Sequence, residues 1–308
     1  MISKFIHLLR CPQTHERLYI KDNNLSSSNN IRTYKIDKNK IILFANNKKD
    51  LHQDSIAQQE HYDKIYRQYI KNIEYPHTKA YTDYLDKKFI NSLKKDLGVC
   101  AEICCGHGEI PSLIKNIKSC IGIDISYNML QLARERFPNN NYLLAQADAT
   151  NLPLQSNKFD SVFMLGGIHH VNDRNKLFSE INRILKPGGR LYFREPANDF
   201  FLWKFLRHII YFLSSGLDHK TERPIIYNET VPILKNNDFT IKKYSHTGFL
   251  GFCIFMNSDI LHFNKLFRFI PGIKKIVKIF TKIDDLLLKI PAFKKMGLQV
   301  IAVAIKNT

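Results

Sequence analysis

The sequence predicts an α/β protein whose core is a doubly wound, mostly parallel sheet. Between residues 96 and 195, short apolar runs alternate with segments of helical periodicity. Such alternation is typical of a parallel sheet covered by helices on both faces. Several apolar runs also end in acidic residues. Because right-handed crossovers bring the carboxyl ends of parallel strands to one edge, where ligands bind, these acids are predicted to converge.

Length and composition set the outer limits of this interpretation. With 308 residues, 44% of them hydrophobic, the chain can bury one sizeable core with appendages. Residues 1–10 lack the sustained apolar stretch of a signal peptide. The six cysteines contain no C-x-x-C pair, so reduced thiols in the cytoplasm are expected. The net charge of +18 is spread along a Lys- and Asn-rich chain, so only local clusters of charge indicate a partner.

Residues 1–50 are expected to form a small β-rich element. A polar run from 22 to 30 separates two apolar stretches, as in a hairpin with a flexible loop, and residues 32–44 suit another strand. The segment resembles a zinc ribbon without its ligands, because Cys11 has no partner cysteines nearby. No metal is therefore predicted. Residues 51–95 are expected to be helical and carry many tyrosines.

A glycine turn lies at the centre of the predicted core. Residues 99–103 form a short apolar strand, 104–108 are small turn residues, and a helix over 109–117 is predicted to start near Pro111. A turn of this kind points backbone N–H groups at a negatively charged ligand, and glycine lets the backbone approach it closely. An ordinary strand-to-helix turn would look the same at this level.

The next strand, 119–124, ends in Asp124. An acid about 20 residues beyond a glycine turn is where a pair of ribose hydroxyls is commonly held. The rest of the alternation is predicted as follows: helix 127–136, strands 142–146 and 159–165, helix 173–185, and strand 189–195.

The C-terminal third interrupts the pattern with helical insertions at 196–229 and 247–297. Within the first, 200–217 is apolar and aromatic but carries Lys204 and Arg207, which favours a lid or a surface-lying helix over a spanning one. The elements outside the insertions are a helix at 231–236 and strands at 239–244 and 298–305.

The second insertion contains a basic amphipathic segment, 273–290. Apolar residues fall on one face and lysines on the other, so residues 257–296 are a candidate contact with a membrane surface. A helix packed on the core with a solvated lysine face is the favoured explanation of the same pattern. Nucleic acid is not expected as a partner, because no basic groove with interleaved aromatic residues can be traced.

Five motifs in order resemble those of class I S-adenosylmethionine-dependent methyltransferases of the small-molecule type, the type 11-like group. They are Glu-Ile-Cys-Cys-Gly-His-Gly at 102–108, the strand ending in Asp124, Ala-Asp-Ala-Thr-Asn-Leu-Pro at 147–153, Phe-Asp-Ser-Val-Phe at 159–163, and Ile-Leu-Lys-Pro-Gly-Gly-Arg-Leu at 184–191. The resemblance covers roughly residues 96–195. It implies seven strands, with an antiparallel last strand inserted beside the fifth, and a helical lid at 51–95.

The resemblance also implies a set of residues that bind S-adenosyl-L-methionine. Glu102 would hold the ammonium group, Asp124 both ribose hydroxyls, and the turn backbone the carboxylate. Ile125 and Met129 would enclose the adenine. The full expected set is Glu102, Cys104, Gly106, Gly108, Asp124, Ile125, Met129, Asp148, Ala149 and Leu165. Cys104 departs from the family pattern, which has glycine there, and cysteine reaches positive φ less readily.

Methyl transfer is an in-line displacement in which alignment and desolvation supply most of the rate. A base is needed only for a hydroxyl or a protonated amine. His169 and His170 follow the fourth core strand. His170 is the first candidate for such a base, and His169 is the second.

The sequence therefore favours an enzyme that methylates a small or lipid-like acceptor at oxygen, nitrogen or carbon. An RNA methyltransferase and a cofactor-binding module without catalysis, suggested by Cys104, stay open. A nicotinamide-dependent oxidoreductase shares the glycine turn and Asp124, but Asp148-Ala149 and the Lys-Pro-Gly-Gly turn oppose it. The expected location is the cytoplasm, with a peripheral contact to the inner membrane as a variant.

Overall fold

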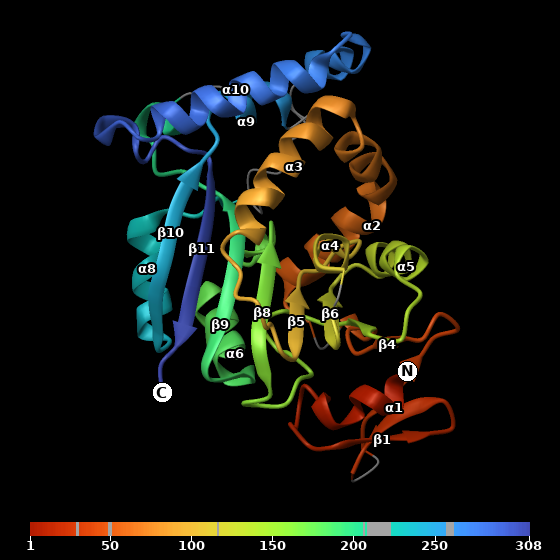
Figure 1. Ribbon diagram of the computed structural model, residues 1–308. Helices are drawn as coiled ribbons and strands as arrows, with labels where there is room; N and C mark the ends of the chain where they lie inside the picture. The colour runs from red at the N-terminus through yellow and green to blue at the C-terminus, as the bar shows by residue number, and fades with distance from the viewer. Residues whose placement is uncertain (29–30, 49–50, 116, 206, 208–222, 257–261) are drawn as a thin grey trace.

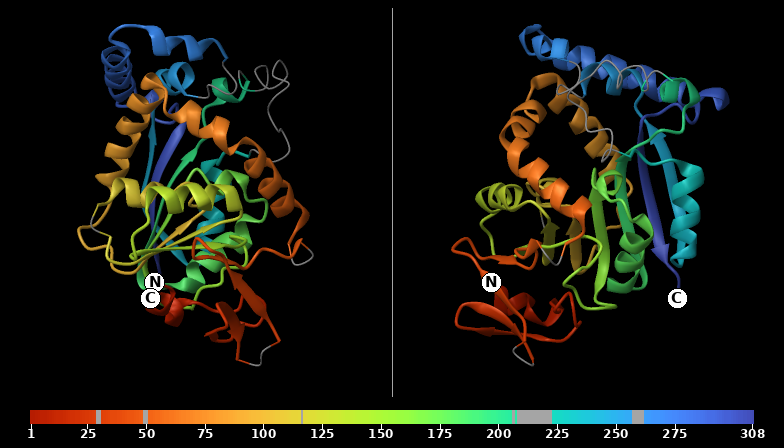
Figure 2. Two further views of the ribbon diagram at one scale, coloured as in Figure 1. Left: turned by 90° about the vertical axis from the view of Figure 1, so that its right-hand side faces the viewer. Right: turned by 180° about the vertical axis from the view of Figure 1, so that it is seen from behind.

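A computed structural model shows one central sheet with helices on both faces (Figures 1 and 2). The structure describes residues 1–28, 31–48, 51–115, 117–205, 207, 223–256 and 262–308. The predicted doubly wound α/β class is confirmed.

The central strands are arranged as expected. In the described part of the chain the order is β7-β6-β5-β8-β9-β11-β10, with β11 antiparallel to both β9 and β10. The parallel members are paired along β7-β6-β5-β8-β9. Their bounds are β5 Cys100–Ile103, β6 Cys120–Asp124, β7 Tyr142–Gln146, β8 Phe159–Leu165, β9 Leu185–Pro196, β10 Phe239–Thr247 and β11 Gln299–Lys306.

The helices follow the predicted positions, with two differences. α4 ends at Leu113 instead of continuing to 117, because Ile114 is already extended. Within the predicted helical insertion at 247–297, residues 262–269 form a 3-10 helix, η4, where an α-helix would also suit the sequence. The longer helices are α2 Gln53–Ile73, α3 Pro76–Ile90, α5 Tyr127–Arg136, α6 Arg174–Ile184, α8 Tyr227–Asn236 and α10 Ile273–Leu287. The short ones are α1 Ile2–Phe5, η1 Ile6–Leu8, α4 Glu109–Leu113, η3 Ile168–His170, α9 Leu250–Phe255, η4 His262–Phe269 and η5 Pro291–Phe293.

The N-terminal residues form strands, as predicted, but these strands extend the central sheet. β4 pairs in parallel with β7, placing Ile42 opposite Ala145. This pairing covers an edge of the central sheet that would otherwise expose unpaired N–H and C=O groups. Phe5 and Leu25 belong to the same hydrophobic cluster as the centre of the sheet. The strands are β1 Leu18–Lys21, β2 Asn24–Ser27, β3 Thr33–Ile36 and β4 Ile41–Leu43.

The buried apolar side chains form three clusters. Two cover the faces of the central sheet. The third lies away from the sheet centre, where Tyr81 and Leu85 of α3 contact Phe252 of α9 and Val277 of α10. Figure 1 shows α10 crossing above α3 and the ends of β10 and β11. The insertion before the last strand is therefore fixed to the helices at 51–95.

The apolar segment predicted at 200–217 lies mostly outside the described residues. Residues 201–205 have helical backbone. Among the described residues, no helix has the length and apolar character needed to cross a membrane.

Candidate functional site

A cavity of about 350 Å³ opens at the carboxyl ends of the parallel strands. Its walls come from the segments that follow β5, β6, β7 and β8, and α2 contributes the remaining side. The connections change direction between β5 and β8, which is the switch point where open α/β sheets bind ligands. The acidic strand ends at Asp124 and Asp148 converge on this cavity, as predicted from topology.

The turn after β5 has the backbone of a ligand-binding loop. Cys104, Gly106 and Gly108 all have positive φ, at 54°, 50° and 82°. Cys104 thus adopts a left-handed conformation that normally favours glycine. Its side chain is accommodated by Gly167, because a Cβ at that position would lie only 2.5 Å from the Cβ of Cys104. Cys104 and Gly106 line the cavity, whereas Gly108 begins α4 outside it.

Asp124 connects the turn to the end of β6. Its carboxylate accepts hydrogen bonds from the Gly106 N–H at 2.7 Å and the Ser126 N–H at 2.9 Å. Burial raises the pKa of Asp124 to about 6, although both N–H donors oppose that change. The carboxylate is therefore ionised at neutral pH.

Further residues of the predicted set also face the cavity. Ile125, Met129, Ala149 and Leu165 line the cavity. Asp148 lines it as well, but both its oxygens already have partners. One accepts from the N–H and hydroxyl of Thr150, at 2.7 and 2.8 Å, and the other accepts from the Ser55 hydroxyl at 2.5 Å. The oxygen that accepts from Ser55 can accept a second hydrogen bond from a ligand.

Helix α2 is joined to the sheet by polar contacts on both sides of the cavity. Ser55 donates to Asp148, and Tyr62 Oη lies 2.6 Å from His170 Nε2. Asp63, the residue after Tyr62 in α2, accepts from the Ser126 hydroxyl and the Asn128 N–H at the start of α5. The sequence indicated a tyrosine-rich helical lid but gave no reason to select Tyr62 or Asp63, because both contacts are made to residues distant in the chain.

The two histidines have different environments. His170 lines the cavity, and burial together with His169 and His61 lowers its pKa well below 6.5, so the imidazole is neutral. Its Nδ1 is buried without a hydrogen-bond partner among the described residues. His169 instead pairs with the buried Glu195 across 2.8 Å and is not part of the cavity wall. Of the predicted pair, the structure places His170 at the site.

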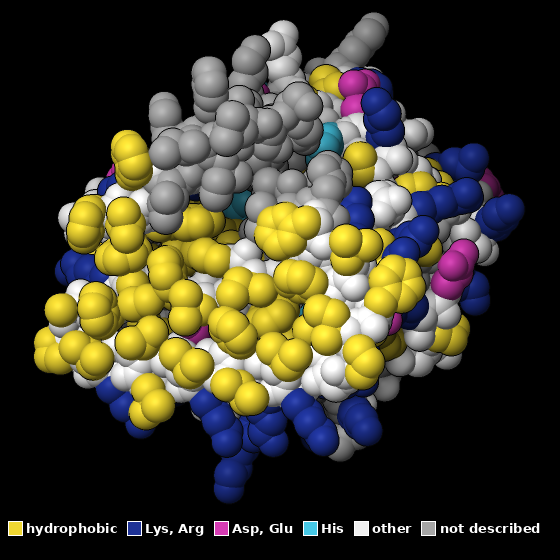
Figure 3. Space-filling view, turned by 90° about the horizontal axis from the view of Figure 1, so that it is seen from above, with side chains coloured by type: hydrophobic (Ala, Val, Ile, Leu, Met, Phe, Trp, Pro, Cys, Tyr) yellow, Lys and Arg dark blue, Asp and Glu magenta, His cyan; other side chains and the backbone are white. Residues whose placement is uncertain are grey.

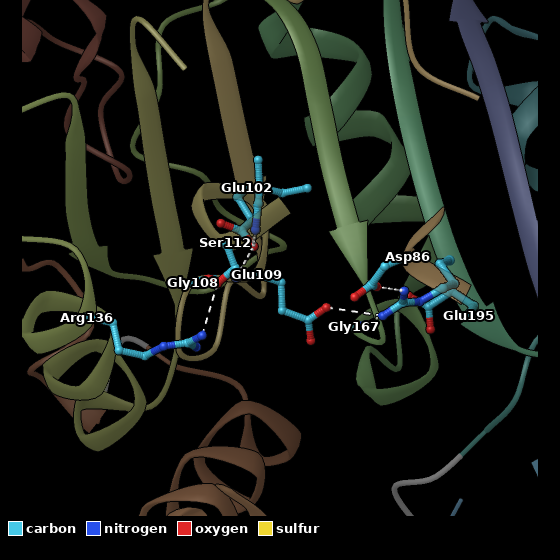
Figure 4. A network of polar contacts seen from close by, with 10 residues as sticks. Asp86, Glu102, Gly108, Glu109, Ser112, Arg136, Gly167 and Glu195 are labelled. Atoms are coloured by element: carbon cyan, nitrogen blue, oxygen red, sulfur yellow. Dashed lines mark hydrogen bonds and ion pairs between the residues drawn. The ribbon is translucent and has the colours of Figure 1, made fainter. Parts of the chain in front are cut away.

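Glu102 does not take the position that the sequence suggested. Its side chain is 1% exposed and is not part of the cavity wall. The carboxyl group accepts from the N–H groups of Glu109 and Ile110 and from the Tyr142 hydroxyl at 2.7 Å. It thereby caps α4 (Figure 4). In this arrangement the acid serves the following helix. A contact of Glu102 with a ligand ammonium group, directly or through water, stays a prediction.

Glu109 is the carboxylate that reaches the cavity from this region. It extends away from Glu102 and forms an ion pair with Arg194 at 3.2 Å (Figure 4). Arg194 also pairs with Asp86 of α3. Burial raises the pKa of Glu109 to about 6 despite the nearby Arg194 guanidinium. No sequence pattern pointed to this pair, because Glu109 is also the first residue of α4 and its acid is explained by that position.

Comparison with known proteins adds an independent line of evidence. A model of a methyltransferase domain matches residues 101–193. A ubiquinone/menaquinone biosynthesis C-methyltransferase of Campylobacter jejuni is 33% identical over 182 residues, covering 51% of this chain and 76% of that protein. A demethylmenaquinone methyltransferase of Staphylococcus aureus is 34% identical over 113 residues, covering 33% and 47%.

A solved structure shows the same fold. The SAM-dependent methyltransferase structure from Thermotoga maritima superimposes with a TM-score of 0.55 at 19% identity, covering 81% of this chain and 99% of that one.

The capping role of Glu102 predicts how stability changes with pH. Burial raises the pKa of Glu102 to about 8 from an ordinary value of 4.5. The folded chain then retains a proton that the unfolded chain releases, so this group lowers stability as pH rises from 4.5 to about 8. Glu102→Gln should flatten that part of the profile, measured by urea unfolding at several pH values. Exposed Glu135→Gln is the control. An unchanged profile in Glu102→Gln would show that the buried carboxyl group is already ionised.

The contact between Cys104 and Gly167 predicts coupled stability effects. Gly167 has φ −112°, so alanine meets no backbone strain there; its Cβ would meet the Cys104 side chain at 2.5 Å and the flexible end of Met164 at 3.1 Å. Gly167→Ala should lower the free energy of unfolding by roughly 1–3 kcal/mol. Cys104→Gly should remove most of that loss in the double variant, since it removes the obstructing side chain. Urea unfolding of all four proteins measures the coupling, and simple additivity would contradict the contact.

Proposed function

The chain belongs to the class I S-adenosylmethionine-dependent methyltransferases, and from this premise we propose which residues hold the donor and what acceptor is methylated. The enzyme transfers a methyl group from S-adenosylmethionine to a small-molecule or lipid-like acceptor. We infer that the acceptor is a hydroxylated aromatic ring with an apolar tail, and that a ring carbon receives the methyl group. The observation that carries this proposal is the contact of Tyr62 with neutral His170 at a cavity that also contains Asp124.

The residues at the strand ends suit the donor. Asp124 is half-buried, ionised at neutral pH and faces the cavity, as an acceptor for ribose hydroxyls must be. Gly106 leaves the turn backbone open, since even a Cβ there would meet only the flexible end of Met129 at 3.2 Å. Ile125 and Met129 offer apolar surfaces for adenine. When bound, the donor supplies an electrophilic methyl group on a sulfonium centre.

The proposed donor site uses Glu109 in place of Glu102, because Glu109 is the one of the two that lines the cavity. Glu109 lines the cavity and already pairs with the Arg194 cation. A ligand ammonium group would find its carboxylate desolvated and oriented by that ion pair. Asp148 can join the donor site through the oxygen that now accepts from the Ser55 hydroxyl, since that oxygen can accept a second hydrogen bond.

The proposed acceptor class rests on the relatives and on the chemistry of Tyr62 and His170. The compared relatives act in quinone biosynthesis, and one is a C-methyltransferase by name. A hydroxylated ring becomes a carbon nucleophile when its hydroxyl group loses a proton, so such a reaction needs a base. Neutral His170 can accept that proton. Because His170 Nε2 lies against Tyr62 Oη, we propose that Tyr62 takes the proton from the acceptor while passing its own to His170.

We also propose that the enzyme meets this acceptor at a membrane surface. An acceptor with an apolar tail would reside in a bilayer, and residues 257–296 include an amphipathic helix with exposed lysines. Residues 257–261 of that range lie outside the described part of the chain. The expected location is therefore the cytoplasmic side of a membrane, with peripheral attachment.

The role of Asp124 can be tested by calorimetry with S-adenosylmethionine. Asp124→Asn should weaken donor binding on the order of tenfold to a hundredfold, because charge-assisted hydrogen bonds to the ribose are lost. Wild-type affinity should also fall as pH drops through about 6, where Asp124 becomes protonated. Asp238→Asn, an exposed position at the other end of the sheet, is the matched control. Equal donor affinity of Asp124→Asn and wild type on both sides of pH 6 would refute the assignment.

The roles of Tyr62 and His170 can be tested by turnover of reduced demethylmenaquinone. Tyr62→Phe and His170→Gln should each lower the turnover number roughly 10²–10⁴-fold, the usual contribution of a positioned acid or base. Donor affinity should stay close to wild type. Tyr69→Phe is the control, since Tyr69 also lines the cavity from α2. Full turnover by both test variants would show that no base acts at this position, and full turnover with another acceptor would reject the quinol class.

A further inference from the structure

We propose that the outer surface formed by α10, η4 and residues 201–205 docks on a lipid membrane that carries negative charge. This surface is called the upper face below, after its place in Figure 1. The inference deepens the proposed membrane contact by defining the docking residues and the charge of the lipid. It rests on the proposed function only for the acceptor that would be met there.

Helix α10 has three faces instead of the two that the sequence suggested. Ile273 and Val277 are buried against α3 and α9. A second apolar row points outward and is spaced at three or four residues, as one stripe of an α-helix requires. The exposed fractions in this row are Ile276 36%, Ile279 56%, Ile283 39% and Leu286 62%, and Ile290, just beyond the end of α10, is 45% exposed. The core does not need these side chains, because the packing face is already supplied.

Lysines form the third face of α10. At 100° per residue, the lysines lie beside the outward apolar row, so that the packed face, the apolar row and the lysine face succeed one another around the helix. The exposed members are Lys274, Lys275, Lys278, Lys282 and Lys289. An apolar row bordered by lysines is the arrangement of helices that lie in the interface of a bilayer, with the apolar row inserted and the ammonium groups at the level of the lipid head groups.

The neighbouring segments continue the apolar surface. In the 3-10 helix η4, residues three apart lie directly above one another, so Phe263, Leu266 and Phe269 form one row. Their exposed fractions are 57%, 65% and 68%. Phe201 and Phe205 are 77% and 65% exposed. Figure 3 shows these contributions as one broad apolar area with Lys and Arg side chains along an edge.

Local packing places residues 201–205 at the same surface. Trp203 packs against the third hydrophobic cluster, which contains Ile273 and Val277 of α10, while Phe200 contacts Phe249 with ring centroids 5.5 Å apart. Exposed apolar areas of this breadth are unusual on proteins that remain dispersed in water. They mark a surface that has a partner.

The charge of the upper face specifies the partner. Between residues 262 and 295 the sequence contains nine Lys and Arg but only two acids, Asp284 and Asp285. Asp284 is fully buried and accepts the N–H groups of Leu250 and Gly251. Asp285 pairs with Lys88 of α3 at 2.7 Å. The exposed charge is therefore predominantly positive, which complements anionic lipid head groups.

A second copy of the chain suits this surface less well, because it would bring two rows of lysines together. Nucleic acid offers the negative charge but no apolar layer for the outward isoleucines and phenylalanines. An anionic bilayer satisfies both requirements, since the apolar row enters the acyl boundary while the lysines meet phosphate groups.

The packing also turns the site side of the molecule toward the membrane. α10 lies on α3, where Tyr84 donates to Asp285 at 2.7 Å. α3 follows α2 after only residues 74 and 75, and α2 lines the cavity. α3 further contributes Asp86 to the Arg194–Glu109 pair at the cavity wall. Docking through the upper face would thus place the helical lid, and not the N-terminal strands, next to the lipid (Figure 2).

Sedimentation with lipid vesicles tests the proposal using the full chain. Wild type should bind vesicles of phosphatidylcholine mixed with phosphatidylglycerol, bind phosphatidylcholine alone weakly, and lose affinity as salt is added. The pair Lys275→Glu and Lys282→Glu should weaken binding to the mixed vesicles by about tenfold or more. Ile279→Glu with Leu286→Glu should abolish it. Lys158→Glu with Lys235→Glu makes the same charge change on exposed lysines at the opposite end of the sheet and should leave binding unchanged.

The results that would overturn the proposal are equally concrete. Membrane docking is refuted if wild type sediments with neither vesicle, or if it binds both equally and independently of salt. A dimer of wild type that Ile279→Glu with Leu286→Glu converts to monomer, seen by sedimentation velocity, would assign the surface to a second copy. Salt-sensitive RNA binding lost in the lysine pair, without vesicle binding, would assign it to nucleic acid.

Donor binding separates this test from the proposed methyl transfer. Because α10 contributes no residue to the cavity wall, every variant should bind S-adenosylmethionine like wild type, which also shows that it is folded. If wild type binds the donor but does not bind vesicles, only the docking proposal is refuted, and the proposed methyl transfer is untouched. If an isoleucine variant does not fold, the lysine pair and the salt response of wild type still decide the result.

Discussion

The hydrogen bond from the Gly106 N–H to the Asp124 carboxylate is the interaction on which the site depends. It joins the turn after β5 to the end of β6 and fixes both at the edge where the parallel strands stop. The bond requires a desolvated carboxylate, whose burial is reflected in its raised pKa. A folded chain can maintain such a charge only because Ser126 also donates to it. The same carboxylate is thereby held in position for a ligand.

Buried carboxylates have contrasting roles around this edge. Glu102 and Glu195 both lie near the ends of central strands and accept backbone N–H groups, Glu102 from the start of α4 after its own strand and Glu195 from Gly167 and Ile168 after the neighbouring strand β8. Each organises a turn or helix start and stays out of the cavity wall. Asp124 and Glu109 face the cavity and remain available to a ligand. Being an acid near a strand end is therefore not enough to place a carboxylate at the cavity, because the direction of its side chain also decides.

The helices outside the central sheet connect the cavity with the upper face. α2 is joined to the strand ends through Ser55, Asp63 and Tyr62, and α3 carries Asp86 toward Arg194. A separate hydrophobic cluster then fixes α10 to α3. One continuous set of packed elements therefore extends from the site of methyl transfer to the lysine-bordered apolar surface. A lipid-like acceptor and the protein's own docking would involve the same side of the molecule.

The sequence by itself determined the order of strands and helices, the glycine turn and the edge of the sheet at which the acids gather. These features follow from local periodicity and from the handedness of crossovers, which leave few alternatives. The tertiary structure decided which acid faces the cavity, which histidine lines it, and which tyrosine contacts that histidine. It also merged residues 1–50 with the central sheet through β4 and divided the apolar residues of α10 between a packed and an exposed row. Several of these outcomes depend on partners more than 50 residues away, such as Tyr62 for His170 and Arg194 for Glu109, and no local pattern encodes those contacts.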